Sequence, residues 1–213
     1  MTVEPLAPDR DVLVRDQDIR EVALELRLLL HRGVSFALAT VVGVQGIALR
    51  RVGAVLVAAE SGESIGFRRD GCLDRAVHEL AVQVLSSGAD QVQRYEIDAE
   101  AASYVGLSGQ VGLDVHVMRV MAGDPGFDDV LRYLDSPVAT VMLIGTRGVS
   151  GCAAVGPDRV VGRLGWAELP WPVVEDARCM LKGHGHARRC YGSDGERGGN
   201  DVELWMQSHP AAG

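Results

Sequence analysis

An internal repeat is the feature that most constrains how this chain of 213 residues folds. Six identities recur at one constant spacing: Gly66 with Gly162, Val77 with Val173, Ala81 with Ala177, Leu85 with Leu181, Tyr95 with Tyr191, and Asp98 with Asp194. Two shorter matches pair Ala39-Thr40-Val41 with Ala139-Thr140-Val141, and Asp114-Val115 with Asp201-Val202. Matches in this number and order indicate two lobes of roughly 90 residues each.

The hydrophobic pattern predicts the same order of elements in both lobes. In the first lobe we expect a helix over 18–31, strands over 36–42 and 53–59, and then a second helix. This second helix is the clearest element, because its apolar residues follow i, i+3, i+4, i+7 spacing and Gly88 can end it; they are Leu73, Ala76, Val77, Leu80, Ala81, Val84 and Leu85. In the second lobe we expect helices over 127–134 and 169–181, and strands over 138–144, 151–155, near Arg188 and over 202–206.

The predicted fold class is therefore α/β, with two similar lobes that each run helix, strand, strand, helix, strand. We place the first lobe at residues 1–122 and the second at 123–213. Two explanations of the repeat are open at this point. The half-sheets cover each other's apolar faces for stability, or they build a site at their junction.

Composition excludes several classes of function. The net charge is −8, so the chain has no overall basic field for nucleic acid. Apolar runs fall well short of the roughly 18–20 residues that cross a membrane, and the N-terminus lacks the pattern of a secretory signal. We therefore expect a cytoplasmic protein that binds neither nucleic acid nor membrane. Four cysteines without a C-x-x-C pair predict neither a disulfide scaffold nor a structural zinc site.

The segment IGFRRDGCLDRAVHE holds the strongest candidate for chemistry. Gly71 and Cys72 fall where a turn leads into the second helix, so a thiol there meets unpaired N–H groups and the positive end of the helix dipole. Arg68, Arg69 and Arg75 lie close by in the sequence. Cys72 is thus a candidate ligand or nucleophile, and the alternative is a small buried apolar residue.

Other polar groups have ordinary explanations beside functional ones. Arg50, Arg51, Arg68 and Arg69 suit either an anion site or a solvated rim. The basic group Lys182, His184, His186, Arg188 and Arg189 is interpreted as a solvated helix cap rather than a metal site. The carboxylates Asp70, Asp74, Glu79 and Asp98 are expected to be exposed, and no catalytic role is assigned to them. No motif of a serine hydrolase, a P-loop or a dinucleotide fold is present.

Three stretches resemble the N-terminal region of the XdhC/CoxI family: ATVVGVQGIALRRVGAVLVAAESGESIGFRRDGCLDRAVHELAVQVLSSG, RYEID and YVGLSGQVGLDVHV. In the second lobe VGPDRVVGRLG, VVEDARCML and YGSDGE are similar to longer members, so the resemblance covers nearly all of residues 20–208. It implies an accessory factor for a molybdenum hydroxylase of the xanthine dehydrogenase or carbon monoxide dehydrogenase type. Such factors bind molybdenum cofactor and help its sulfuration and insertion.

The family turns match this chain in part. G-S-x-P-R-x-x-G corresponds to residues 46–53 and keeps the glycines and Arg50, while S-G-G-C-V-E corresponds to 69–74 and keeps Gly71, Cys72 and an acid, Asp74. G-L-x-C-G-G corresponds to 106–111, where Gly109 replaces the cysteine. The resemblance thus implies a site for molybdenum cofactor (molybdopterin) formed by Gly46, Arg50, Gly53, Gly71 and Cys72, with no metal ligand or catalytic residue assigned. It requires the three turns to meet at an open cleft.

The expected function is that of a non-enzymatic accessory factor, with a molybdenum hydroxylase subunit or a cofactor-sulfurating protein as partner and a homodimer as the assembly. The alternative is a degenerate homologue that binds no cofactor and acts as a scaffold or regulatory module. The lost cysteine supports this alternative, as does the expectation that the chain ends at Gly213 without the Rossmann domain of longer members. A small enzyme with its site at the lobe junction is a third reading.

Overall fold

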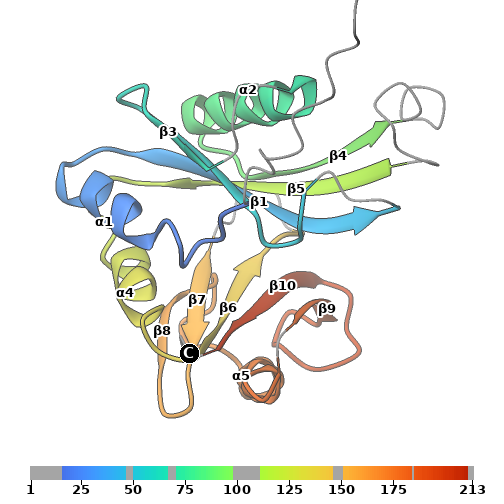
Figure 1. The fold of residues 1–213 in the computed structure, drawn as a ribbon. Helices are drawn as coiled ribbons and strands as arrows, with labels where there is room; N and C mark the ends of the chain where they lie inside the picture. The colour runs from blue at the N-terminus through green and yellow to red at the C-terminus, as the bar shows by residue number, and fades with distance from the viewer. Residues whose placement is uncertain are drawn as a thin grey trace, which may run out of the picture.

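The computed structural model describes residues 16–46, 50–66, 71–97, 111–145, 151–183 and 185–210. Within them the chain forms two five-stranded antiparallel sheets (Figure 1). The first lobe contains α1 (Ala23–His31), β1 (Phe36–Gln45), β2 (Val55–Ala59), β3 (Ser64–Gly66), α2 (Cys72–Ser87), β4 (Gln91–Ile97) and β5 (Val111–Val120). The second contains α4 (Pro125–Tyr133), β6 (Val138–Leu143), β7 (Cys152–Val155), β8 (Val160–Arg163), α5 (Trp171–Met180), β9 (His186–Tyr191) and β10 (Val202–His209).

Strand order confirms the prediction of two similar lobes. The sheets run β3-β2-β1-β5-β4 and β8-β7-β6-β10-β9, which is one topology used twice. The predicted element order was incomplete: each lobe has three strands between its helices, and the two closing strands expected in the second lobe are present in the first lobe as well. Strands β3 and β8 span only three and four residues, too few for an alternating pattern to stand out in the sequence.

The first helix begins later than the pattern predicted. Residues 19–22 form a turn, in which the Asp18 carboxylate accepts hydrogen bonds from the N–H groups of Arg20 and Glu21. Asp124 makes the same pair of bonds where it caps α4, so Asp18 caps a turn that leads into the helix, and the regular α-helix begins after this turn. The second helix has the predicted limits. Gly88 ends it with φ +71°, and its N–H donates a hydrogen bond of 2.8 Å to the Val84 carbonyl.

Hydrogen-bond ladders correct two of the repeat matches. Tyr95 pairs with Leu113 and Tyr191 with Val202, so Leu113 is the counterpart of Val202. The match of Asp114-Val115 with Asp201-Val202 was therefore wrong by two residues. Two residues are one full pleat, which keeps every side chain on its own face.

The same slip affects the first short match. Leu56 pairs with both Gly66 and Ala39, and Ala153 pairs with both Gly162 and Val141. Given that Gly66 matches Gly162, Ala39 corresponds to Val141 rather than to Ala139. The pattern of burial could not reveal this two-residue error, because both alignments of the copies place the same side chains in the core.

Three apolar cores hold the layers together. One face of the first sheet packs against α2 and one face of the second against α5, at opposite ends of the view in Figure 1. The inner faces of both sheets share the remaining core with α1 and α4. In it the rings of Phe36 and Phe127 meet edge to face, with centroids 6.0 Å apart. The half-sheets therefore cover each other's apolar faces.

Gly66 and Gly162 explain why one repeat match persists. Their φ angles are +92° and +87°, a region that side chains rarely adopt. A Cβ atom at either position would also overlap a backbone carbonyl oxygen of the neighbouring strand, that of Val55 or of Cys152. Both β3 and β8 thus require glycine at the same place.

Gly66→Ala and Gly162→Ala should each lower the free energy of unfolding by about 2 kcal/mol or more, because steric overlap adds to the cost of the left-handed conformation. Urea denaturation measures the loss. Gly62 is the matched control, since its φ is +87° but nothing lies within 4 Å of its missing Cβ. Equal losses in all three variants would show that the overlap is relieved at no cost.

The shared core predicts a large effect at Phe127, which is 4% exposed. Phe127→Ala should lower the free energy of unfolding by about 3–5 kcal/mol by leaving a cavity between the lobes. Met121, which is 52% exposed, supplies the control, and Met121→Ala should stay within about 0.5 kcal/mol of the parent. A small loss at Phe127, measured by urea denaturation, would contradict the joint core.

Candidate functional site

The five candidate residues lie on two turns of the first lobe: Gly46, Arg50 and Gly53 on the connection from β1 to β2, and Gly71 and Cys72 at the start of α2. Residues 106–110 of the third predicted turn lie outside the described residues, and so do Arg68 and Arg69. The structure therefore shows how the first two of the three predicted turns lie relative to each other.

Cys72 is the first residue of α2 and its side chain is exposed. Gly71 precedes it in an extended conformation, with φ −105° and ψ 155°, and supplies no side-chain cap to the helix. The alternative of a buried apolar cysteine is therefore wrong for Cys72. It describes Cys152 instead, where burial, followed by the charge of Asp124, raises the pKa of the thiol to about 12.

A buried ion pair joins the two turns. The Arg50 guanidinium donates from Nε and Nη2 to the two carboxylate oxygens of Asp74, over 3.2 and 2.5 Å. Its Nη1 donates to Asp16 over 3.1 Å. The side chains of Arg50 and Asp74 are 16% and 6% exposed. Burial by itself lowers the pKa of Arg50, but the hydrogen bonds and charges of Asp74 and Asp16 outweigh it and raise the pKa.

Asp74 is the site residue that sequence reasoning missed. It was expected to be an exposed acid, yet it is buried beneath the start of α2. Its Oδ2 lies 3.6 Å from the place where a Cβ of Gly71 would be. Two signals were usable: the acid that the 69–74 turn keeps from the family motif, and its position three residues after the N-cap, where an acid usually interacts with the helix terminus.

The other glycines connect this site to the second lobe. Gly46 and Gly53 have φ angles of +77° and +88°, so the β1–β2 connection uses the left-handed region twice. A Cβ at Gly53 would lie 2.5 Å from Nε2 of Gln207 in β10. Arg51, beside it, pairs with Glu21 over 2.7 Å and with Asp18 over 3.5 Å. The β1–β2 connection therefore touches α2 on one side and the lobe junction on the other.

A polar cleft of about 390 Å³ lies at this junction. Both lobes line it, through Asp18, Arg20, Glu21, Arg51, Gly185, His186, Gln207, Ser208, His209 and Pro210. Arg20 ties its walls together by donating to the carbonyl oxygens of Ser136 over 2.8 Å, of His209 over 2.9 Å, and of Pro210. Its two arginines and two acids balance in charge, so the lining favours no strongly charged ligand.

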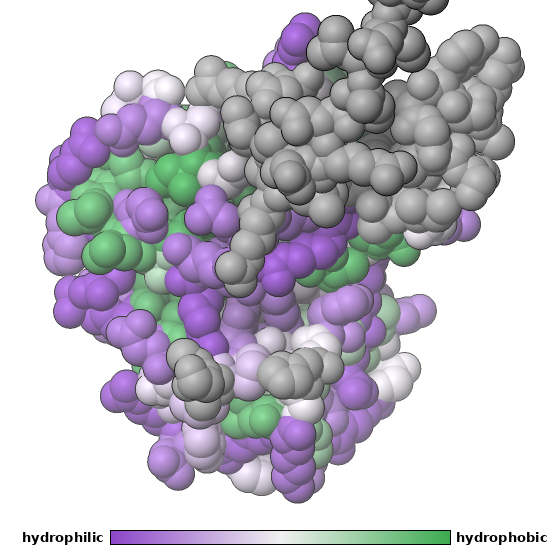
Figure 2. Space-filling view, in the orientation of Figure 1, coloured by the Kyte–Doolittle hydropathy of each residue, from purple (hydrophilic) through white to green (hydrophobic). Residues whose placement is uncertain are grey.

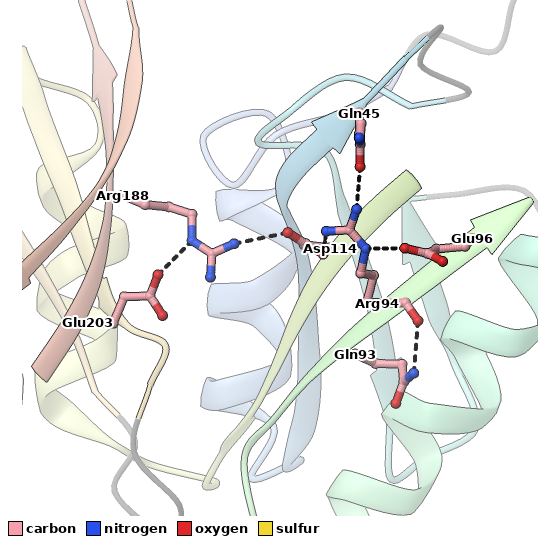
Figure 3. Close-up of polar contacts among 7 residues, drawn as sticks. All are labelled: Gln45, Gln93, Arg94, Glu96, Asp114, Arg188 and Glu203. Carbon is pink, nitrogen blue, oxygen red and sulfur yellow. Dashed lines mark hydrogen bonds and ion pairs between the residues drawn. The ribbon is translucent and has the colours of Figure 1, made fainter. Parts of the chain in front are cut away.

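A second polar contact between the lobes lies at the strands β5 and β9 (Figure 3). Arg188 donates to Asp114 over 2.9 Å and to Glu203 over 2.8 Å. The ladders make Asp114 and Glu203 counterparts, so one guanidinium binds the equivalent carboxylates of both sheets. Arg94 holds Asp114 from its own sheet, over 3.3 Å. Arg188 is therefore a bridge between lobes, which corrects its interpretation as part of a solvated cap.

The described residues contain no group of His, Cys, Asp and Glu that could hold a metal ion. None of the described helices is long and apolar enough to cross a membrane. Figure 2 shows mixed polar surface with green apolar areas on the side where α1 and α4 lie. Leu24 and Leu28 of α1 are 65% and 53% exposed. Exposed leucines of this kind also occur on ordinary protein surfaces.

Comparison with known proteins finds a family model that matches part of the first lobe. Residues 29–96, which include β1, the paired turns and α2, match the model of the XdhC and CoxI family. This segment is therefore similar to the family that the sequence resemblance pointed to. A search of curated proteins finds no match.

A solved structure supports the fold over both lobes. It is described as a xanthine dehydrogenase from Bacillus halodurans, is 19% identical to this chain, and superposes with a TM-score of 0.57. The match covers 89% of this chain and 53% of that one, so this chain spans about half its length. At this identity the likeness concerns the fold alone.

Removing Arg50 should be costly, because Asp74 would keep a buried charge without its principal partner. We expect Arg50→Ala to lower the free energy of unfolding by about 3–5 kcal/mol. The matched control is the exposed pair of Arg32 and Glu63, 3.0 Å apart, where Arg32→Ala should cost about 0–1 kcal/mol. Similar values for both variants in urea denaturation would contradict a buried anchor.

His209 predicts a loss of stability in acid. Burial lowers the pKa of His209 to about 4 from 6.5; nearby Asp18 raises it, and Arg20 and Arg51 lower it further. The unfolded chain therefore binds the proton first as the pH falls. The contribution of His209 is complete above its unfolded pKa and is lost as the pH falls towards 4.

Unfolding in urea across this pH range measures the effect. His209→Gln should flatten the pH dependence of the free energy of unfolding. Equal slopes for His209→Gln and the parent protein would contradict a neutral buried imidazole.

Proposed function

We propose that the chain is an accessory factor in the maturation of a molybdenum hydroxylase, the process with which the XdhC and CoxI family is associated. In finer terms, it would bind molybdenum cofactor as cargo and deliver it to a client of the xanthine dehydrogenase or carbon monoxide dehydrogenase type. The observation that carries the proposal is the exposed Cys72 thiol. It lies on a turn held by the Arg50–Asp74 pair, within the segment that matches the family model.

The candidate residues fit such a cargo in part. A thiol is a suitable donor near a soft metal or its dithiolene sulfurs, and Cys72 is open to solvent. The cation that was expected to bind the anionic end of the cofactor is engaged elsewhere, because Arg50 faces Asp74 and Asp16. Cys72 and the first turn of α2 would therefore contact the cargo, with Arg50 outside the contact.

A second candidate function is a scaffold that binds the client enzyme without cofactor. The charge around the β1–β2 connection favours it. Arg50 and Arg51 are outnumbered by Asp16, Asp18, Glu21 and Asp74, all within their contact distance. This excess of negative charge among the described residues disfavours binding of an anionic ligand beside the β1–β2 connection.

Cofactor content decides between the two functions. The protein purified from a host that makes molybdenum cofactor should carry molybdenum and release a fluorescent pterin on oxidation. Cys72→Ser should lower both severalfold, since it removes the sulfur ligand. Cys179 is also an exposed free thiol, on α5, so Cys179→Ser should leave both unchanged.

Two results would count against cargo binding. One is wild-type protein with neither metal nor pterin that still captures a hydroxylase subunit, which is the outcome expected of the scaffold. The other is equal pterin content in the Cys72→Ser and Cys179→Ser variants, which would remove Cys72 from the site.

A further inference from the structure

We propose that Asp74 is a positioning residue: its pair with Arg50 fixes the first turn of α2, and thereby the Cys72 thiol, relative to the β1–β2 connection. Its relevance to cargo rests on the proposed function, but the positioning itself does not. The proposal gives a role to a carboxylate two residues from the thiol that neither the motif nor composition assigned.

The geometry of the pair limits movement in two directions. Both carboxylate oxygens of Asp74 accept from Arg50, and a guanidinium bound at two points by a carboxylate has a fixed orientation as well as a fixed distance. The pair is largely excluded from solvent, with side-chain exposures of 16% and 6%. Water therefore competes weakly for either partner.

Arg50 is itself held from the opposite side. Asp16 accepts from Nη1 of Arg50 through one oxygen, and through the other it accepts from the backbone N–H of Arg51 over 2.7 Å. Asp16 thus holds both the side chain and the backbone of the turn. The backbone carbonyl of the neighbouring Gln17 accepts a hydrogen bond from the N–H of Val55, at the start of β2, over 2.8 Å. The anchor of α2 therefore leads to the first sheet rather than to a loose loop.

The start of α2 lacks the usual side-chain restraint. An acid three residues after the N-cap often bonds back to the N-cap N–H, but here Gly71 has no side chain to share in a capping box, and Asp74 bonds to Arg50. Among the residues that the structure describes, no side chain caps the terminus, although the Arg75 N–H donates a hydrogen bond to the Gly71 carbonyl over 3.1 Å. The Arg50–Asp74 pair is consequently the side-chain tether for the turn that presents Cys72.

Site-resolved alkylation tests this role on the full chain. The probe is iodoacetamide, and peptide mass spectrometry gives the rate at Cys72 relative to the exposed Cys179 of the same molecule. Asp74→Asn should raise this ratio at least threefold, because the untethered first turn frays. Asp74→Glu restores the carboxylate and should return the ratio toward that of the parent.

Two further variants separate tethering from general destabilisation. Asp16→Asn loosens Arg50 from the opposite side but leaves both of its hydrogen bonds to Asp74, so it should raise the ratio less than Asp74→Asn does. Arg50→Lys keeps the charge but not the two-point geometry, and should raise the ratio. It also supplies the test if Asp74→Asn does not fold. Thermal unfolding of each variant confirms that rates are compared between folded proteins.

An unchanged Cys72 to Cys179 ratio in Asp74→Asn and Arg50→Lys would overturn the proposal, as would an equal rise in Asp16→Asn. Pterin analysis of the same preparations keeps the two hypotheses apart. A raised ratio in a protein that carries no pterin supports positioning and contradicts cargo binding. An unchanged ratio with pterin present supports cargo binding and contradicts positioning.

Discussion

Each sheet in this protein has two apolar faces, and a single lobe has a helix for only one of them. The α2 helix covers the outer face of the first sheet, and α5 covers that of the second. The inner faces would remain in water if the lobes separated, so they pack on one another together with α1 and α4. This mutual burial makes the two lobes one folding unit, and it sets the distance at which every polar contact between them must form.

The polar contacts lie where this apolar packing ends. At one margin Arg20 binds three carbonyl groups of the second lobe, and at another Arg188 bridges Asp114 and Glu203. Guanidinium groups suit these positions, because they can donate several hydrogen bonds in fixed directions while remaining partly hydrated. The candidate site lies beside the margin at Arg20, and the β1–β2 connection contributes residues both to the candidate site and to this margin. A change in how the lobes pack would therefore reach Arg51 and Gly53 before it reached Cys72.

The sequence contains the repeat, the helix α2 and the class of fold, because these depend on periodic burial and on glycines that sterics enforce. It does not reveal the register between the copies, since a slip of two residues leaves the inward and outward faces unchanged. The site shows the same division. The place of Cys72 at a helix start follows from local pattern, whereas the burial of Asp74 depends on Arg50, far away in the chain. Long-range pairing of this kind has no local signature.

The duplication also sets how many thiols of this type one molecule can offer. The two lobes share their topology, but α5 begins at Trp171 behind Pro170, so the second copy has no cysteine at the corresponding helix start. A fused pair of lobes thus presents a single such sulfur, on one side of a nearly symmetric body. A ligand that depends on this sulfur therefore finds one such site in each chain, and the second lobe contributes through the core and the polar contacts that it shares with the first.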